Sequence, residues 1–265
     1  MDYYARTGLT RGQLHMLALL VAKEIGTIVQ PGIRPPVIGL FDSVVMVVTL
    51  MRRNIVQEMA GEIFGCSQPT VSRRWDKLRP VIGKVLARFV PDPAEVTGRR
   101  GTVLVDGTVC PTWDWSAVPD LFSGKVHFAG MNVQIAAAMN GEVAAIGQVP
   151  VHGARHDAHA FEASGLKDRL AHMDGKIADT GYIGVDGIEI VPFRRSPGGN
   201  LDESQTEFNT CLSKLRAAVE HAVAKVKTWR MLSEEGGRYR CPLYKYESML
   251  TAVTGLLFFA KYSNF

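Results

Sequence analysis

The spacing of apolar residues divides the chain into two parts. Up to about residue 90, apolar residues recur at intervals of three and four, which predicts amphipathic helices packed together. The stretch "PDPAEVTGRR" that follows combines two prolines, a glycine and a basic pair, a composition typical of a linker. We therefore expect a helical domain over residues 1–90, a linker over 91–101 and a second domain over 102–265.

From Thr102 onward the pattern indicates a sheet with helices packed on it. Short β-prone runs are separated by turn signals and predict strands at 102–108, 131–139 and 142–151, the last two forming a hairpin about Asn140-Gly141. Beyond them, the pattern predicts a helix at 157–173, strands at 176–179 and 188–193, and a long helix from about Gln205 to Arg230. The expected fold class is α+β, with an all-helical N-terminal domain followed by a mixed-sheet α/β domain.

Composition narrows the class of protein. With 46% hydrophobic and 21% charged residues in 265, the chain can bury a core, and it is not a disordered chain. Its longest apolar runs, near residues 44 and 249, are shorter than the roughly 20 residues of a membrane crossing. The N-terminus lacks the pattern of a secretory signal. We expect a cytoplasmic protein, associated with the nucleoid and with no membrane partner.

Charge is unevenly distributed along the chain. Residues 1–100 hold 14 Lys and Arg against 8 Asp and Glu, a balance of +6, whereas residues 101–265 hold 16 against 18. This asymmetry suggests that the N-terminal part meets a polyanion, and a basic solvated surface is the alternative. Four cysteines, at 66, 110, 211 and 241, form no CxxC pair, which argues against a zinc ribbon and a disulfide scaffold.

Residues 54–78, "NIVQEMAGEIFGCSQPTVSRRWDKL", carry the pattern of a helix-turn-helix. Gly61 allows close helix contact, Gly65 permits a tight turn, and Ser67 can cap a second helix with Pro69 in its first turn. The buried stripe of that helix is expected at Val71, Trp75 and Leu78. The polar residues left to meet base edges and phosphates are Gln68, Thr70, Ser72, Arg73, Arg74 and Lys77. A short helical hairpin with a basic second helix but no DNA ligand would show the same pattern.

Two aspartates follow apolar strands and precede glycine turns. Asp106 lies in "TVLVDGT", and Asp179 lies in "KIADTGYIG". An aspartate that only forms the turn is the simple interpretation of each. In open sheets, however, side chains at strand ends project from the rim where ligands bind, so two such carboxylates in one domain also indicate a site.

A third carboxylate lies on the long helix "FNTCLSKLRAAVEHAVAKVKTWRML". Its apolar arc comprises Phe208, Leu212, Leu215, Val219, Val223 and Val226, and a second, flanking arc comprises Asn209, Arg216, Glu220 and Lys227. A solvated face with an Arg–Glu pair at i, i+4 is the alternative. If the helix docks on the sheet, Glu220 can complete a cluster of three carboxylates, with Arg216 and Lys227 beside it to hold phosphates.

Three carboxylates in one small site require hard cations, and oxygen-only ligation suits Mg²⁺ or Mn²⁺. Two such ions can activate a water or a 3′-hydroxyl and stabilise the leaving oxygen of a phosphodiester. A basic DNA-binding part joined to such a site suggests an enzyme that cuts DNA.

At these residues the chain resembles the DDE transposases of bacterial insertion sequences, specifically the insertion-sequence-five and Harbinger-like group, often labelled a DDE superfamily endonuclease. The matching motifs are, in order, "VDGT" with Asp106, "HDAHAF" with Asp157, "ADTGYIG" with Asp179 and the long helix with Glu220. The N-terminal helix-turn-helix also fits, so the resemblance covers roughly residues 40–235. The helix motif, with Phe208-Asn209, Arg216, Glu220, Lys227 and Trp229, is the most specific of them.

The resemblance implies an RNase H-like catalytic domain in which Asp106, Asp179 and Glu220 are catalytic and hold two Mg²⁺ (or Mn²⁺) ions. It makes Asp157 an accessory acid. It also implies cleavage and strand transfer at the terminal inverted repeats of an element, with target DNA as second substrate, by a homodimer or larger assembly on double-stranded DNA.

Two other functions stay open. The segment "HGARHDAH" offers His152, His156, Asp157 and His159 as zinc ligands of a hydrolase, although His156 or Asp157 can instead cap a helix. A DNA-binding regulator derived from a transposase that no longer cuts is the other. The chain contains no P-loop, HExxH or GxSxG motif, which argues against an ATPase, a metalloprotease or an α/β-hydrolase.

Overall fold

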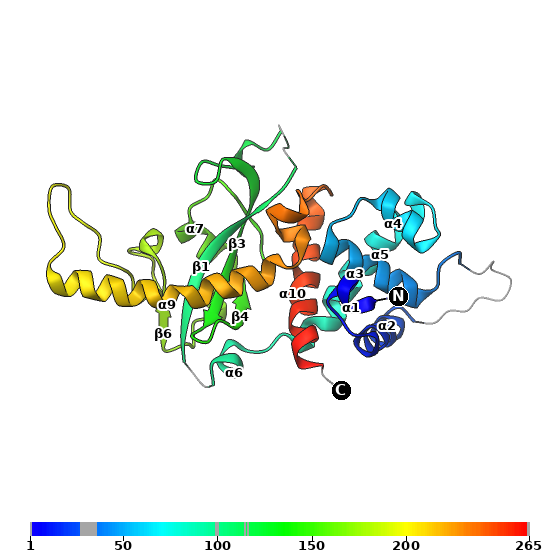
Figure 1. Ribbon diagram of the computed structural model, residues 1–265, viewed down its shortest axis with the longest axis horizontal. Coiled ribbons are helices and arrows are strands. Elements are labelled where there is room, and N and C mark those ends of the chain that lie inside the picture. Colours follow the sequence, from blue (N-terminus) through cyan, green and yellow to red (C-terminus); the bar gives the residue numbers. More distant parts are fainter. Residues whose placement is uncertain (1, 27–35, 99–100, 114, 116, 264–265) are drawn as a thin grey trace. The chain divides into compact units, whose positions relative to one another are not determined.

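The computed structural model describes residues 2–26, 36–98, 101–113, 115 and 117–263. Its contacts divide the chain into two compact units, the first made of Met1–Val90 and Thr228–Phe265 and the second of Pro91–Lys227 (Figure 1). The change of unit after Val90 lies where the sequence pattern changes. By their contacts, residues 228–265, expected in the second domain, group with the N-terminal helices.

The apolar character of the last helix explains why it groups with the N-terminal helices. Helix α10 (Tyr246–Tyr262) is buried on most sides and packs on α5 (Gln68–Leu86). Glycines let the two helices approach closely: a Cβ on Gly255 would lie 2.7 Å from the Leu86 Cβ, and one on Gly83 would lie 3.2 Å from the Thr251 Cγ2. The helix therefore completes the core of the N-terminal helices.

The first unit is helical, as the spacing of apolar residues predicts. Its N-terminal elements are α1 (Tyr3–Thr7), α2 (Arg11–Ile25), α3 (Leu40–Arg53), α4 (Gln57–Phe64), α5 and the short 3-10 helix η1 (Ala87–Phe89). Helix α2 starts with a capping box between Thr10 and Gln13. Residues Ser43 to Met51 of α3 are all buried, so this helix is the centre of the unit. Residues 27–35 lie outside the described part of the predicted helical region.

The link between α4 and α5 is a tight turn. Gly65 ends α4 in the left-handed region with φ of 65°, where glycine is favoured. A Cβ on Gly61 would lie only 2.5 Å from the Cys66 carbonyl oxygen, so the close contact needs glycine there. Ser67 occupies the N-cap position, but its hydroxyl lies 3.1 Å from the Thr70 hydroxyl and caps no backbone amide. The predicted stripe of Val71, Trp75 and Leu78 is buried.

The second unit contains a six-stranded mixed sheet with the central order β2-β3-β1-β6. Its strands are β1 (Thr102–Pro111), β2 (Phe122–Ser123), β3 (Phe128–Ala138), β4 (Val143–Ile146), β5 (Val151–His152) and β6 (Gly175–Ile177). Strand β1 is antiparallel to β3 and parallel to β6, while β4 and β5 also pair with β3. The mixed sheet confirms the α+β class, and the predicted hairpin turns at Gly141, where φ is 79°.

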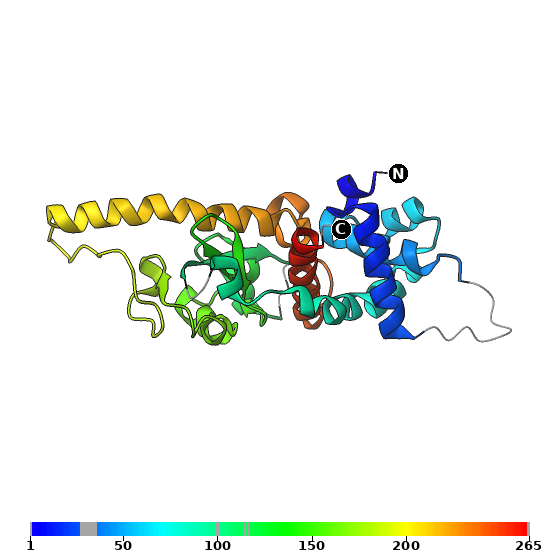
Figure 2. The same ribbon diagram turned by 90° about the horizontal axis from the view of Figure 1, so that it is seen from below.

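Helices cover both faces of this sheet. On one face, Val103 and Val105 pack in a cluster with Phe161 of α7 (Asp157–Ala163) and with Leu170, which follows α8 (Leu166–Arg169). Helix α9 (Glu203–Lys227) lies on the other side (Figure 2) and buries Leu212, Val219, Ala222 and Val226. Because side chains alternate along a strand, Asp106 projects from β1 on the face opposite Val103 and Val105.

The first half of α9 extends beyond the sheet (Figures 1 and 2). This explains why two residues of its predicted buried arc are more than a third exposed, Phe208 at 39% and Leu215 at 37%. Phe208 contacts Phe193 edge to face, with 5.3 Å between the ring centroids. The Asn209 amide accepts from the Phe193 backbone N–H at 2.8 Å and donates to its carbonyl at 3.0 Å.

Several predicted elements are shorter in the structure. Gly165, with φ of 75°, divides the helix expected at 157–173 into α7 and α8. The strand expected at 188–193 is reduced to one bridge between Ile190 and Ile177. The linker expected at 91–101 contains the helix α6 (Pro93–Thr97), which packs on the sheet at β4, and its residues 99–100 lie outside the described part. Over the described ranges, no helix combines the length and apolar character needed to cross a membrane.

Candidate active site

Asp106 and Asp179 lie side by side because of the strand register. The parallel strands β1 and β6 pair Leu104 with Ile177, and each aspartate follows its strand's paired residue by two positions. The carboxyl ends of parallel neighbours meet at one edge of the sheet. Two residues 73 positions apart in the sequence are therefore brought to the same point.

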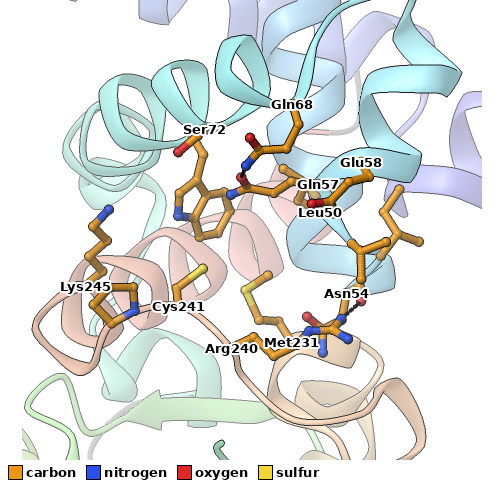
Figure 3. A pocket seen from close by; sticks show the side chains of 14 residues that line it. Leu50, Asn54, Gln57, Glu58, Gln68, Ser72, Met231, Arg240, Cys241 and Lys245 are labelled. Atoms are coloured by element: carbon orange, nitrogen blue, oxygen red, sulfur yellow. Dashed lines mark hydrogen bonds between the residues drawn. The ribbon is translucent and has the colours of Figure 1, made fainter.

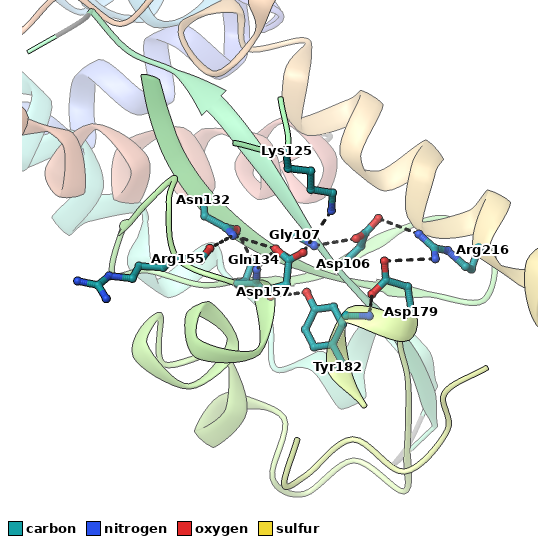
Figure 4. Close-up of polar contacts among 11 residues, drawn as sticks. Asp106, Gly107, Lys125, Asn132, Gln134, Arg155, Asp157, Asp179, Tyr182 and Arg216 are labelled. Carbon is teal, nitrogen blue, oxygen red and sulfur yellow. Dashed lines mark hydrogen bonds and ion pairs between the residues drawn. The ribbon is translucent and has the colours of Figure 1, made fainter. Parts of the chain in front are cut away.

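Both aspartates point toward the guanidinium group of Arg216 on α9 (Figure 4). The Arg216 Nη2 lies 3.5 Å from the Asp106 Oδ2, and its Nη1 lies 3.5 Å from the Asp179 Oδ2. All three side chains are largely buried, with exposed fractions of 17% for Asp106, 20% for Asp179 and 29% for Arg216. Two carboxylates thus share a single cation at the sheet edge.

The two aspartates differ in local structure: Asp179 holds a turn, as the simple interpretation expects, whereas the turn expected at Asp106 is absent, because β1 continues through Gly107 to Pro111. The Asp106 Oδ1 accepts from the Gly107 backbone N–H at 2.9 Å. The Asp179 Oδ1 accepts from the Gly181 backbone N–H at 2.8 Å and caps the 3-10 helix η3 (Thr180–Tyr182). In both residues a nearby backbone N–H binds one oxygen, and the second oxygen faces the shared site.

The site carries more negative charge than its cation neutralises. Burial is the main reason why the pKa of Asp106 is raised to about 6; Arg216 lowers this pKa, and the charges of Asp179 and Asp157 raise it. The raised pKa means that the charged form of this carboxylate is less stable in the site than it would be in water. The site would gain free energy from an additional cation.

Asp157 lies at the start of α7 beside Gly107. Its Oδ1 accepts from the Asn132 Nδ2 at 2.8 Å and from the Gln134 Nε2 at 3.4 Å, and its Oδ2 lies 3.4 Å from the Lys125 Nζ. A Cβ on Gly107 would lie 2.2 Å from the Asp157 Oδ1 and 2.4 Å from the Gln134 Nε2. The absence of a side chain at position 107 therefore makes room for the carboxylate.

This polar group extends into the core. The Tyr182 hydroxyl donates to the Gln134 Oε1 at 2.7 Å, and burial raises the pKa of Tyr182 well above its ordinary value, so the phenol remains a donor. The network links the turn after Asp179 to strand β3. Sequence analysis did not identify Asn132 and Gln134, although they are the two polar residues, two positions apart, of the otherwise apolar run "MNVQIAAAM".

Glu220 is exposed on α9, one turn beyond Arg216 and on the same side of the helix. Within the described ranges, no three Asp, Glu, His or Cys side chains gather closely enough to hold a metal ion. The structure thus brings together two of the three predicted ligands and leaves Glu220 outside a closed cluster. Lys227, the last residue of α9, is half-buried.

The paired aspartates fit a hard divalent cation by their chemistry. Their free donors are carboxylate oxygens, which Mg²⁺ and Mn²⁺ prefer, and they already converge on one cationic group. The proposed zinc ligands fit less well. His152, His156, Asp157 and His159 form no metal-holding group among the described residues, and His156 stands at the N-cap of α7 without a side-chain cap.

The residues predicted to bind DNA lie along the first half of α5. Arg73 and Lys77 are exposed, whereas Gln68, Thr70, Ser72 and Arg74 are half-buried. Thr70 accepts from the Arg73 Nη2 at 3.2 Å, and the Arg74 Nη2 donates to the Ile38 carbonyl at 3.4 Å. The Gln68 Nε2 donates to the Gln57 Oε1 at 2.7 Å. Gln57 was not identified from the sequence.

A pocket of about 460 Å³ opens beside the first residues of α4 and α5 (Figure 3). Gln57, Gln68 and Ser72 line it from these helices, and Arg240 and Lys245 line it from the chain before α10. The Arg240 Nη2 donates to the Asn54 carbonyl at 2.7 Å, and the Lys245 Nζ lies 2.6 Å from the Asp76 Oδ1. The cations at this pocket are thus held by neighbours within the helical unit.

Comparison with known proteins gives two kinds of match. Residues 105–257 match the family described as "DDE superfamily endonuclease". The chain is 30% identical to a putative transposase for insertion sequence element IS112 of Streptomyces albus G, over 86% of this chain and 84% of that protein. It is 25% identical to a probable transposase for insertion sequence element IS702 of Microchaete diplosiphon, over 93% of this chain and 94% of that protein. No solved structure matches the chain.

Proposed function

We propose that this chain, which belongs to the DDE superfamily endonuclease family, is a transposase that binds element ends and performs divalent-metal-dependent DNA cleavage and strand transfer. The family and the transposase relatives make it a nuclease or transposase enzyme. One observation supports the proposed reaction most directly. Asp106 and Asp179 converge on Arg216 at the carboxyl edge of the sheet, which is an acidic site suited to further cations.

In this proposal, Asp106 and Asp179 hold two Mg²⁺ or Mn²⁺ ions together with Glu220, which the turn of α9 beyond Arg216 carries. Bound there, such ions activate a water or a 3′-hydroxyl and stabilise the leaving oxygen of the phosphodiester. The chain's own contribution is to orient the ligands. The backbone amides of Gly107 and Gly181 each fix one oxygen of an aspartate and so aim the other into the site.

Arg216 and Lys227 have supporting roles in the proposed site. Arg216 neutralises part of the aspartate charge and keeps the two carboxylates together before DNA arrives. Lys227, further along α9, is proposed to hold a DNA phosphate. The mixed sheet with helices on both faces is compatible with the RNase H-like fold that we propose for the second unit.

We further propose that α4 and α5 form a helix-turn-helix that binds double-stranded DNA at the terminal inverted repeats. The first residues of α5 would enter the major groove, with Gln68, Thr70 and Ser72 toward base edges and Arg73, Arg74 and Lys77 toward phosphates. The short turn at Gly65 and the exposure of Arg73 and Lys77 support this role. Joining two ends to target DNA requires two active sites, so a homodimer or larger assembly is proposed.

A DNA that carries the ends flanking the gene provides the test. We expect the parent protein to nick it at the element boundary with Mg²⁺ or Mn²⁺ and not with EDTA. Glu220→Gln should abolish the cuts, because it removes the third carboxylate. Glu207→Gln is the matched control, since Glu207 is another exposed glutamate of the same helix, and it should cut at the parental rate.

The same experiment separates the proposal from its main alternative. Tight, specific end binding by the parent without any metal-dependent cut would identify a regulator derived from a transposase. The exposed position of Glu220 outside a closed metal group is the observation that favours this alternative. Cutting that survives in Glu220→Gln would remove Glu220 from the proposed ligands and leave the reaction in place.

A further inference from the structure

Lys125 reaches toward the candidate active site from the turn between β2 and β3 (Figure 4). Its Nζ lies 3.4 Å from the Asp157 Oδ2, and its side chain is 69% exposed. Arg216 approaches the same acidic site from α9. Two cations from different elements therefore stand at the site, and sequence analysis identified only Arg216.

The largely buried Asp157 carboxylate binds the Lys125 ammonium, but other hydrogen bonds already stabilise this carboxylate. The Asp157 side chain is only 14% exposed, and its Oδ1 already accepts from the amides of Asn132 and Gln134. These bonds fix the direction of the carboxylate, so its Oδ2 can restrain a flexible lysine. Because the lysine of this pair is 69% exposed and the Nζ–Oδ2 distance is 3.4 Å, solvent screens the attraction and the pair contributes little to stability. The placement of Lys125 is therefore better explained by what it can bind.

The charges around Lys125 suit a phosphate ligand. The Asp157 carboxylate, followed by those of Asp179 and Asp106, raises the pKa of Lys125 above its ordinary value, so the amine stays protonated. An ammonium has three N–H donors, and Asp157 takes one of them. Arg216 already binds two aspartates, whereas Lys125 keeps donors directed to solvent at the mouth of the site.

We propose that Lys125 binds a phosphate of the DNA strand that is cut, and that Asp157 is the positioning residue that holds its ammonium beside the active site. This inference deepens the proposed function and rests on it. It assigns Asp157 a task through Lys125, which differs from holding a metal ion. It also explains Gly107, whose missing side chain lets the Asp157 carboxylate lie against β1.

Substitution of the full-length protein tests the contact. With DNA carrying the element ends and Mg²⁺ present, Lys125→Met should lower kcat/KM for nicking about 10- to 100-fold, the range of one charge-assisted hydrogen bond. Lys125→Arg keeps the charge and should stay within a few-fold of the parent. Lys167→Met is the matched control, because Lys167 is also an ion-paired lysine of this unit, 2.9 Å from Asp186, and lies on α8. It should leave nicking unchanged.

Replacing single DNA phosphates with uncharged analogues identifies the phosphate that Lys125 contacts. Methylphosphonate linkages placed one at a time around the cut should slow the parent most at one phosphate, and Lys125→Met should lose this extra sensitivity at that position alone. Asp157→Asn should give a smaller loss and raise KM more than it lowers kcat, since it loosens the ammonium without removing it. In binding measurements, the slope of log affinity against log salt should shrink by about one in Lys125→Met.

The outcomes separate the two proposals. Thermal unfolding of each variant at the parental temperature establishes that the fold is intact. If the parent binds the ends but makes no metal-dependent cut, the proposed reaction fails, and an unchanged salt slope in Lys125→Met then overturns the phosphate contact as well. If the parent cuts and Lys125→Met keeps its rate, salt slope and methylphosphonate profile, only the role of Lys125 is overturned.

Discussion

The Asp157 carboxylate lies in the space that a side chain at Gly107 would fill. A Cβ there would come within 2.2 Å of the Asp157 Oδ1, far inside van der Waals contact. The neighbouring residue in the strand is Asp106, so this steric relationship joins the accessory acid directly to the proposed metal site.

Gly107→Ala should therefore displace Asp157 and its partners. Overpacking of this kind typically costs about 1–3 kcal/mol of unfolding free energy, and the shift should also lower metal-dependent nicking. Gly124→Ala is the control, because a Cβ there meets no atom within 4 Å and its φ does not require glycine. Urea unfolding and nicking of both variants check the prediction. Equal stability of the two variants would contradict the close approach at Gly107.

Removal of the shared cation should make the aspartates bind metal more tightly while cleavage slows. In the parent protein, the guanidinium of Arg216 lies 3.5 Å from both Asp106 and Asp179 and competes with any divalent ion for these carboxylates. Arg216→Gln removes this positive charge. We expect the Mn²⁺ affinity without DNA, measured by electron paramagnetic resonance, to rise about tenfold. Arg155→Gln breaks a surface pair with Asp120 and should change nothing. Weaker Mn²⁺ binding in Arg216→Gln would show that the guanidinium does not compete with the ion.

The raised pKa of Asp106 predicts how stability depends on pH without metal. Burial raises this pKa to about 6, so as pH rises from about 4 to 6 the unfolded chain releases a proton that the folded chain retains. The contribution of Asp106 to stability is thus present at low pH and lost as pH rises through 6. Asp106→Asn should be about 1–3 kcal/mol more stable than the parent at pH 7.5 and nearly equal at pH 4.

Urea unfolding in EDTA at the two pH values measures this difference. Asp174→Asn, at an exposed position of the same unit, serves as the reference and should match the parent at both. A gain in Asp106→Asn that is the same at pH 4 and pH 7.5 would mean that its charge is not the cause.

The pair of glutamines that begin α4 and α5 predicts a base preference. The Gln68 side-chain amide donates one N–H to the Gln57 Oε1 at 2.7 Å. This bond fixes the plane of the Gln68 amide and leaves its second N–H and its oxygen available to a base. This arrangement matches adenine in the major groove. Gln68→Ala should weaken end binding and lose about tenfold discrimination at one A·T pair.

A phosphate contact should behave differently from this base contact. Lys77→Ala, at an exposed position of α5, should weaken all sequences alike and reduce the salt slope by about one. Affinity measured on a panel of single-base variants distinguishes the two effects. A uniform loss in Gln68→Ala would place Gln68 away from the bases.

The two compact units predict which fragments fold. Residues 91–227 contain the whole sheet and its helices and should fold alone, with a cooperative thermal transition. Residues 1–90 should not, because they lack α10, whose large buried side chains include Met249, Leu250, Val253, Leu256, Phe258 and Phe259. At about 2 kcal/mol for each, their burial matches the whole stability of a domain. Co-expression of residues 228–265 should restore the helical spectrum, and a stable fold of residues 1–90 alone would refute the assignment.

Local patterns predict much of this structure. Helical spacing locates the N-terminal helices, and the stripe at Val71, Trp75 and Leu78 is buried as expected. The turn glycines Gly65 and Gly141 adopt positive φ. These features depend on neighbouring residues only, so a single sequence is sufficient to predict them.

The structure differs from the sequence-based predictions where contacts between distant parts of the chain determine how an element packs. The apolar run near residue 249 predicts a core helix, but no local signal shows which core it completes. The arc of α9 predicts its buried face, yet the sheet ends before Phe208 and leaves it partly exposed. For the site, the expected strand end is present at Asp179 but not at Asp106, which lies inside β1. Lys125 gives no signal, because its proposed role follows only from the place where Asp157 lies.

The return of residues Thr228–Phe265 to the N-terminal helices affects how the protein is made. The ribosome releases α10 after residues 91–227, so the helical unit cannot close its core until the entire sheet unit has been synthesised. A messenger RNA truncated within the codons for residues 91–227 would yield a chain whose proposed DNA-binding unit is incomplete. Under the proposed function, simple truncation would therefore not yield a protein that occupies the element ends and blocks the intact enzyme.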